Sequence, residues 1–273
     1  MKIYLGPLGT VSFLLLSACI LLNVVVGIFF LLRKNDNKRA DYFFATWQFA
    51  FALTAAHGVL VLQDIYREQP QYLFLPVYFT LSLGMLLFFS IKLRLFPAYK
   101  FVASDVKHFL LPVGQFLYFL LLFTLASTAF RQTVGRKFYS PFYGGLEMGF
   151  YIATFYGYLF GAYRYLRYKV GSLRHTEPGW PLHEALQLRR LIRVMLVLFW
   201  INSAYIVADF VMYELLQLNM HNFRGFTRFG DLSFAVMAGW AGWMGVVLLL
   251  KRPYKSFSDG LLFQLKKYLR KGR

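Results

Sequence analysis

The sequence predicts an all-α polytopic membrane protein, a bundle of seven transmembrane helices with its N-terminus outside and its C-terminus in the cytoplasm. Of its 273 residues, 58% are hydrophobic and 20% aromatic, above the apolar share of about 45–50% in soluble domains. Crossing about 30 Å of hydrocarbon takes about 20 apolar residues per helix. Seven apolar runs of about this length fill most of the chain: 8–32, 42–62, 72–91, 109–129, 142–162, 194–218 and 231–250.

The orientation follows from the positive charges. The first run has only Lys2 before it and exceeds a signal-peptide core of about 7–15 residues, so we expect an uncleaved span. Positively charged loops are retained in the cytoplasm. Seven alternating spans place 23 of the 30 Lys and Arg residues on one side, in segments 33–39, 92–107, 164–193 and 251–273. This distribution predicts a multi-pass protein of a bacterial cytoplasmic (inner) membrane, with residues 1–250 forming the bundle.

The net charge of +18 would by itself suggest a nucleic-acid partner. The excess lies on the predicted cytoplasmic face, where anionic lipid headgroups attract Lys and Arg. We therefore expect the bilayer with its anionic headgroups as a partner, and no direct nucleic-acid binding. Segment 251–273 is predicted as a basic amphipathic tail that lies on the membrane or docks on a protein partner. Its charged face carries Lys266, Lys267, Arg270 and Lys271.

Two runs carry small residues at four-residue spacing, which lets neighbouring helices approach closely. In run 231–250 the pair is Ala238 and Gly242. We expect these ridges to pack within one bundle, with a dimer face as the alternative. The longer ridge, in run 142–162, comprises Gly145, Gly149, Ala153, Gly157 and Gly161.

The sixth run carries a polar stripe. Asn202, Tyr205, Asp209 and Tyr213 follow one another at steps of three, four and four residues, a spacing that places them on one helix face. An ionised carboxylate at the bilayer centre costs about 3 kcal/mol, so Asp209 is expected to face the bundle or a wet cavity.

Other polar residues of the outer half could join this stripe in a ligand-binding pocket. His57 and Asp64 lie seven residues apart in one run, and Glu147 and Asp231 belong to two others. The alternative is that Asp209 only ties helices together through a hydrogen bond to a Tyr or His. We expect Arg224 and Arg228 at the rim of such a pocket.

No catalytic constellation is visible. The five His residues form no HxxxH or HExxH pair, and one cysteine, Cys19, can form neither a thiolate metal set nor a disulfide framework. No glycine pattern of a nucleotide-binding loop occurs. The sequence therefore predicts a non-enzymatic protein with no metal and no cofactor.

Three stretches carry a family resemblance: "NKRADYFFATWQFAFAL", "LSLGMLLFFSIKLRLF" and "DVKHFLLPVGQFLYFLLLF". Their succession resembles the seven-helix membrane portion of AraC-type regulators of Bacteroidetes and spirochaetes, over about residues 11–250. The family typically has Gly-Pro where this chain has Gly84-Met85, and a His close to Leu-Pro where three residues separate His108 from Pro112. Only 23 residues follow Leu250, whereas the family's DNA-binding output domain needs about 100.

The resemblance implies a sensor-like bundle without that output domain. We accordingly expect a membrane sensor or adaptor that relays ligand or partner binding in its outer half to cytoplasmic loops, with a membrane or cytoplasmic protein as partner. The alternative is an accessory subunit of a larger membrane complex. A small transporter ranks third, because seven spans do not divide into the equal halves of an inverted repeat.

Overall fold

The computed structural model describes residues 6–33, 37–138, 141–176, 180–218, 220 and 223–250. Across these ranges the chain is helical and contains no strand, so the predicted all-α class is confirmed for them. Five of the described helical segments are long and apolar enough to cross a membrane, which supports a multi-pass membrane protein. They are Gly6–Leu32, Lys38–Leu62, Ala103–Leu125, Leu182–Tyr213 and Gly225–Leu250.

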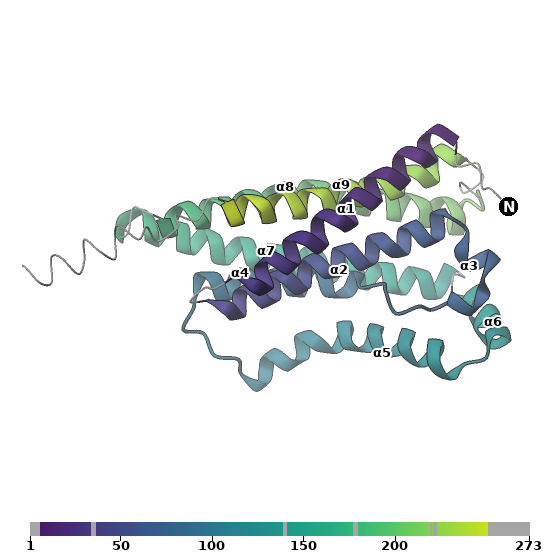
Figure 1. Ribbon diagram of the computed structural model, residues 1–273, viewed down its shortest axis with the longest axis horizontal. Coiled ribbons are helices and arrows are strands. Elements are labelled where there is room, and N and C mark those ends of the chain that lie inside the picture. Colours follow the sequence, from purple (N-terminus) through teal and green to yellow (C-terminus); the bar gives the residue numbers. More distant parts are fainter. Residues whose placement is uncertain are drawn as a thin grey trace, which may run out of the picture.

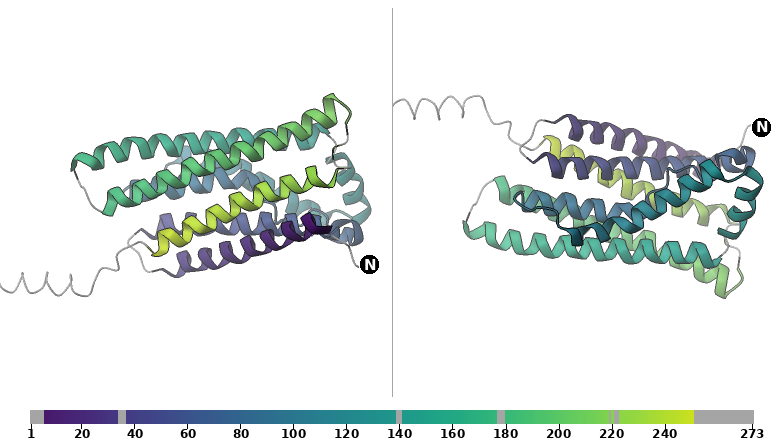
Figure 2. Two further views of the ribbon diagram at one scale, coloured as in Figure 1. Left: turned by 90° about the horizontal axis from the view of Figure 1, so that it is seen from above. Right: turned by 90° about the horizontal axis from the view of Figure 1, so that it is seen from below.

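Six long helices pack side by side, each against the next, and the last returns to the first (Figures 1 and 2). We call the end where α1 stops and α2 starts the basic end, and the other the opposite end. In order of packing the helices are α1 (Gly6–Leu32), α2 (Lys38–Leu62), α4 (Thr80–Leu95), α7 (Pro141–Thr176), α8 (Trp180–Phe210) and α9 (Arg224–Leu250).

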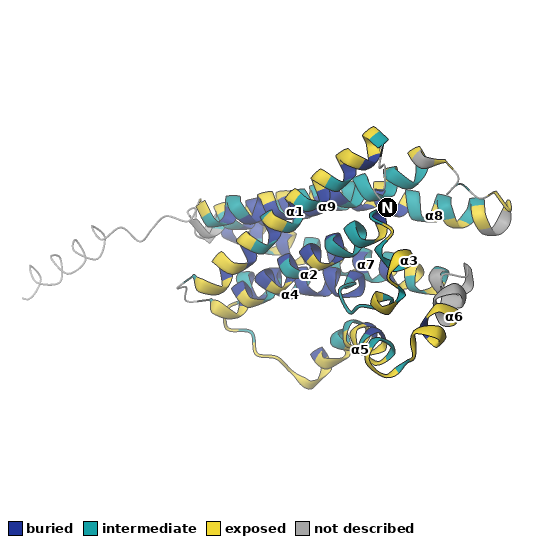
Figure 3. Ribbon diagram, turned by 45° about the vertical axis from the view of Figure 1, so that its right-hand side comes forward, coloured by how far each residue is buried: buried dark blue, intermediate teal, exposed yellow. Residues whose placement is uncertain are grey.

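Helix α5 (Leu110–Leu125) lies outside this group (Figures 1 and 3). A 3-10 helix, η2 (Ala103–Phe109), leads into it, and its main neighbour is α4. Within α5, whose residues are all described, only Gln115 and Phe119 are buried. At the opposite end the short elements are α3 (Ile65–Glu68), η1 (Pro70–Tyr72) and α6 (Thr128–Phe138).

The third apolar run, predicted as a helix over 72–91, is helical only from Thr80. Residues 73–79 form no helix, and Phe74 has a φ of 63°. Pro76 explains the interruption in part, because proline lacks an N–H and disfavours helical geometry at the residue before it. The non-helical stretch therefore occupies the half of this run nearer the opposite end.

The sixth run also differs from its predicted bounds of 194–218. Helix α8 begins at Trp180 and ends at Phe210, and a π-helix, η3 (Val211–Leu215), follows it. Asp209 thus lies in the last turn of α8 rather than in mid-helix.

Small residues of α9 let α1 and α2 approach its backbone. A β-carbon at Gly242 would lie 2.7 Å from Leu22 Cγ. In the same contact Asn23 Nδ2 donates to the Ala238 carbonyl (3.1 Å), and Gln48 Nε2 donates to the Ala241 carbonyl (3.0 Å). The α9 ridge therefore packs inside the bundle, and two buried amides add hydrogen bonds to that packing.

The glycine ridge of α7 does not keep to one side. A β-carbon at Gly145 would meet Phe210 of α8 (2.7 Å), one at Gly161 would meet Phe88 of α4 (3.2 Å), and Gly149, Ala153 and Gly157 between them are exposed. Steps of four residues exceed the helical turn of 3.6, so the ridge winds around the helix. This differs from the expectation that the whole ridge packs within the bundle. The predicted tail, 251–273, lies outside the described residues.

Candidate functional site

The residues predicted to form one outer pocket divide between separate places in the structure. We call the first the α8–α9 cluster, formed by Asn202, Tyr205, Asp209, Arg228 and Asp231. The second, the α4-start cluster, surrounds the first turn of α4 and comprises Thr54, Thr80, Gln115 and Glu147.

In the α8–α9 cluster, Asn202 is buried, with 5% of its surface exposed. Its Nδ2 donates to Ser233 Oγ (2.9 Å), and that hydroxyl donates to the Gly230 carbonyl (2.9 Å). Asn202 Oδ1 has no hydrogen-bond partner in the described part of the chain. Because a buried acceptor without a donor is costly, at about 1–3 kcal/mol, this amide is suited to receive a donor from a ligand or water.

Tyr205 lies one turn further along α8, toward the opposite end. Its ring packs over Gly230, where a β-carbon would collide with it, and its centroid is 4.9 Å from that of Phe226. Asp209 and Asp231 both lie near enough to act electrostatically on its hydroxyl. The structure therefore brings together four members of the predicted pocket, Asn202, Tyr205, Asp209 and Asp231.

Arg228 forms an ion pair with Asp231, with Nη1 and Oδ2 3.0 Å apart and each side chain 24% exposed. This partial exposure leaves the pair within reach of solvent at the opposite end. The side chain of Arg224, the other predicted rim residue, lies outside the described side chains.

Tyr213 does not continue the stripe. It belongs to the π-helix η3 and is 42% exposed. A π-turn holds one residue more than an α-turn, so the register of the stripe changes directly after Asp209. π-turns inside helices occur frequently at functional sites.

The α4-start cluster supplies hydrogen-bond acceptors to backbone N–H groups where α4 begins after the non-helical stretch. Thr54 Oγ1 accepts from the Phe79 N–H (3.2 Å), and Gln115 Oε1 accepts from the Leu81 N–H (3.3 Å). The first N–H groups of a helix lack partners within that helix, and a membrane interior has no water to satisfy them. Side chains of α2 and α5 supply acceptors here.

Gln115 also joins α4 to α7. Its Nε2 donates to Thr80 Oγ1 (3.2 Å) and to Glu147 Oε1 on α7 (2.6 Å). Glu147 therefore contacts α5 rather than the stripe on α8. Sequence reasoning missed Gln115, although a lone glutamine in an apolar run is a signal for a buried hydrogen bond.

His57 and Asp64 are not brought together. His57 Nδ1 is 2.9 Å from Tyr66 Oη, and its ring centroid is 4.9 Å from that of Tyr78. Asp64 lies beyond the end of α2 at Leu62, is exposed, and has a φ of 50°. The helical spacing that predicted one shared face does not extend to Asp64.

At the basic end, Arg94 binds the carboxylates of Asp41 and Glu184, and we call these three residues the ion triad. The Nη2 atom of Arg94 is 2.6 Å from Asp41 Oδ1, and its Nη1 is 3.1 Å from Glu184 Oε1. Only 3% of the Arg94 side chain is exposed. Arg94 lies in the last turn of α4 and Asp41 in the first turn of α2, where helix dipoles favour their charges. Glu184 lies near the start of α8.

The described residues contain no group of three His, Cys, Asp or Glu side chains that could hold a metal ion. Comparisons with protein-family models, curated proteins and solved structures find no match for this chain. The described residues thus define the class of the protein as an all-α bundle with several helices able to cross a membrane.

Proposed function

We propose that this chain is a non-enzymatic membrane sensor or adaptor that relays binding at its outer half to its cytoplasmic end. One feature of α8 carries the proposal. This helix bears Asn202 and Asp209 in its last turns and Glu184, which binds Arg94, near its start. A shift of α8 at the α8–α9 cluster would therefore be transmitted to the ion triad at the basic end.

The proposal includes seven spans. Helix α4 has 16 residues, fewer than the about 20 that cross a bilayer, and the preceding stretch 73–79 would complete its crossing. Non-helical backbone at membrane depth is tolerated where protein side chains satisfy it, as Thr54 and Gln115 do here. Helix α7 has 36 residues, many of them tyrosine and glycine, and would form the other added span.

The orientation in this proposal places the basic end in the cytoplasm of a bacterial-type inner membrane, because positively charged loops are retained there. The α8–α9 cluster then faces the extracytoplasmic side. The proposal also rests on the resemblance of three stretches to the membrane portion of AraC-type regulators, which implies a sensor-like bundle.

The ligand proposed for the α8–α9 cluster is a small amphiphile with a hydrogen-bond donor. The buried Asn202 Oδ1 offers the acceptor, Asp209 and Asp231 add negative charge, and the Tyr205 and Phe226 rings offer an apolar surface. Arg228 already neutralises Asp231 through their ion pair, so the cluster favours a neutral or singly cationic group.

The test is purification of the tagged full-length protein in mild detergent from its native membrane, with mass spectrometry of the small molecules and proteins that accompany it. Three forms are compared: wild type, Asn202→Leu and the control Thr124→Val, which removes an exposed hydroxyl on α5 that bonds only to its own helix. We expect one small molecule to be enriched with the wild type and the control, and lost from Asn202→Leu.

Asp209→Asn should preserve folding and reduce the amount of that small molecule recovered with the protein. Equal recovery of the same small molecules with all three forms would remove the α8–α9 cluster from ligand binding. A stoichiometric membrane partner without any enriched small molecule would favour an accessory subunit over a sensor.

A further inference from the structure

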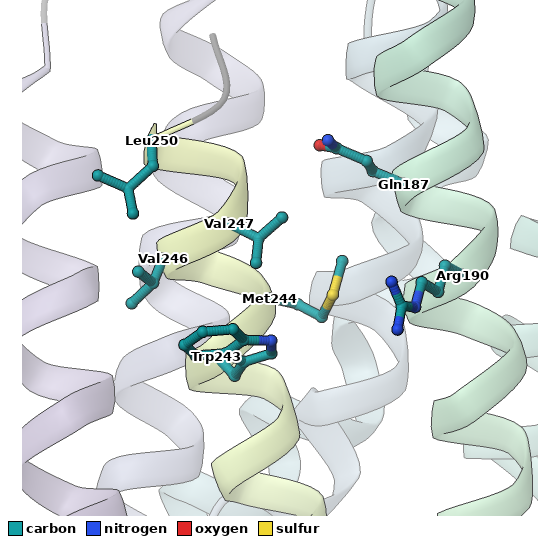
Figure 4. Close-up of a pocket in the computed structure, with 7 residues that line it drawn as sticks. All are labelled: Gln187, Arg190, Trp243, Met244, Val246, Val247 and Leu250. Atoms are coloured by element: carbon teal, nitrogen blue, oxygen red, sulfur yellow. The ribbon is translucent and has the colours of Figure 1, made fainter.

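A hydrogen bond joins α8 to α9 beside a groove between the two helices. Trp240 Nε1 donates to the Leu191 carbonyl (3.4 Å). Beyond this contact a groove of about 310 Å³ opens between the two helices (Figure 4). It is lined by Gln187 and Arg190 of α8 and by Trp243, Met244, Val246, Val247 and Leu250 of α9.

The α9 side of the groove is apolar and open to the outside of the bundle. Trp243 is 55% exposed and Leu250 is 77% exposed. In a membrane these side chains face lipid, so the groove is reached sideways from the bilayer. Its volume falls within the range of about 300–1,000 Å³ for small-molecule sites.

The α8 side of the groove is polar. Gln187 is 8% exposed, and its amide points from α8 toward α9 (Figure 4). Its Nε2 lies 2.9 Å from His183 Nε2, whereas its Oε1 is buried without a hydrogen-bond partner among the described residues. A buried amide of this kind calls for a polar group in the groove.

Arg190 supplies the positive charge. Its guanidinium is directed toward α9 and lies 6.0 Å from the centroid of the Trp240 ring (Figure 4). The neighbouring arginines of α8, Arg189 and Arg193, interact instead with Tyr163 of α7. Arg190 is therefore the α8 arginine placed to bind an anion at the groove.

We propose that this groove binds one anionic glycerophospholipid, with its phosphate on Arg190, a headgroup hydroxyl on Gln187 and an acyl chain along Trp243 and Val247. Basic pockets between transmembrane helices on the cytoplasmic side hold anionic lipid headgroups by the same combination of charge and apolar contact. The site lies at the other end of α8 from the α8–α9 cluster and does not depend on the proposed sensor function.

The binding test uses full-length protein reconstituted in phosphatidylcholine and phosphatidylglycerol, then washed in mild detergent, with the retained phospholipids counted by mass spectrometry. One arginine near the membrane surface contributes about 1 kcal/mol, so we expect about fivefold enrichment of phosphatidylglycerol in the wild type. Arg190→Gln should lose this enrichment, and Val247→Trp, which fills the groove, should retain less of either lipid.

The matched control is Arg167→Gln. Arg167 is exposed on α7, nine residues before the helix ends at Thr176, much as Arg190 lies ten residues after α8 begins at Trp180. Its replacement removes the same charge away from the groove. The control should keep the enrichment. Equal loss in Arg167→Gln and Arg190→Gln would overturn the proposal, because the basic surface as a whole would then attract the lipid.

A second measurement identifies the occupant directly. A photoreactive benzoylphenylalanine in place of Trp243, which is already an aromatic side chain at the groove, should form an adduct with the mass of phosphatidylglycerol. An adduct with a peptide from residues 251–273, or with a second copy of the chain, would overturn the proposal in favour of a protein segment.

Discussion

The guanidinium of Arg94 is enclosed by two carboxylates and two aromatic rings at the basic end. Its Cζ lies 5.3 Å from the Phe30 ring centroid and 5.4 Å from that of Phe44, beside the ion pairs with Asp41 and Glu184. Removing one member of a buried ion network leaves the others without compensation, which costs more than the intact network contributes.

Arg94→Gln should therefore lower the free energy of unfolding by about 3–5 kcal/mol. The measurement is reversible unfolding of the purified protein in mixed detergent micelles. Lys100→Gln, which changes an exposed charge at the same end, should change it by less than about 0.5 kcal/mol.

The combined variant Arg94→Met, Asp41→Leu, Glu184→Met tests whether the loss comes from uncompensated charges or from the lost geometry of the ion triad. It removes the unpaired charges, so most of the stability lost in Arg94→Gln should return. A combined variant as unstable as Arg94→Gln would show that the triad stabilises the bundle by its specific geometry rather than by mutual compensation.

Gln115 has a comparable position at the start of α4. Gln115→Leu should destabilise the protein by about 1–3 kcal/mol, because the Leu81 N–H and Glu147 lose a buried partner. Unfolding in mixed micelles measures this effect. Glu147→Gln keeps a carbonyl acceptor for Gln115 and should cost less; a larger loss in Glu147→Gln would assign the stabilising role to the charge of Glu147.

At the scale of elements, two glycines of similar sequence context have different environments. Gly242 of α9 packs against Leu22, whereas a β-carbon at Gly157 of α7 would meet nothing within 4 Å. Gly242→Leu should destabilise the bundle by about 1–3 kcal/mol through overpacking. Gly157→Leu should be neutral or stabilise it by up to about 1 kcal/mol, because leucine favours a helix more than glycine does.

Thermal unfolding of the two variants in one detergent tests this pair. Equal destabilisation at both positions would indicate that the exposed part of the α7 ridge is itself in contact with another helix in solution.

The elements also show which parts of the site were accessible to sequence reasoning. A helical spacing predicts one face only while the helix is regular, and it grouped Asn202, Tyr205 and Asp209 on α8. It failed at Tyr213, where η3 changes the register, and at Asp64, which lies past the end of α2. The partners of Gln115 lie on α4 and α7, and those of Arg94 lie on α2 and α8. No local spacing relates them.

At the scale of the whole molecule, the testable property is orientation. Lys38 and Lys100 are exposed at the basic end, and Gln69 and Gln217 are exposed at the opposite end. Each of these positions is replaced in turn by a single cysteine. A membrane-impermeant maleimide added to intact spheroplasts should label positions 69 and 217 at once, and positions 38 and 100 only after lysis, because positive loops are retained inside.

Cys19 is buried, so the background labelling of the parent protein should be low. Labelling of position 38 in intact spheroplasts would reverse the proposed orientation. Labelling of positions 38 and 100 from different sides would instead contradict the proposed number of spans.

The sequence by itself determined that the chain is all-α and has helices able to cross a membrane, because those properties depend on composition and on the length of apolar runs. It also divided the segments between apolar runs into one group rich in Lys and Arg and another group poor in them. Only the tertiary structure decided that Glu147 contacts Gln115, that Arg94 joins Asp41 and Glu184, and that Gln187 and Arg190 line a groove beside α9. Such contacts arise between segments distant in the chain, and the rotation and spacing of packed helices, which no single run encodes, bring them together.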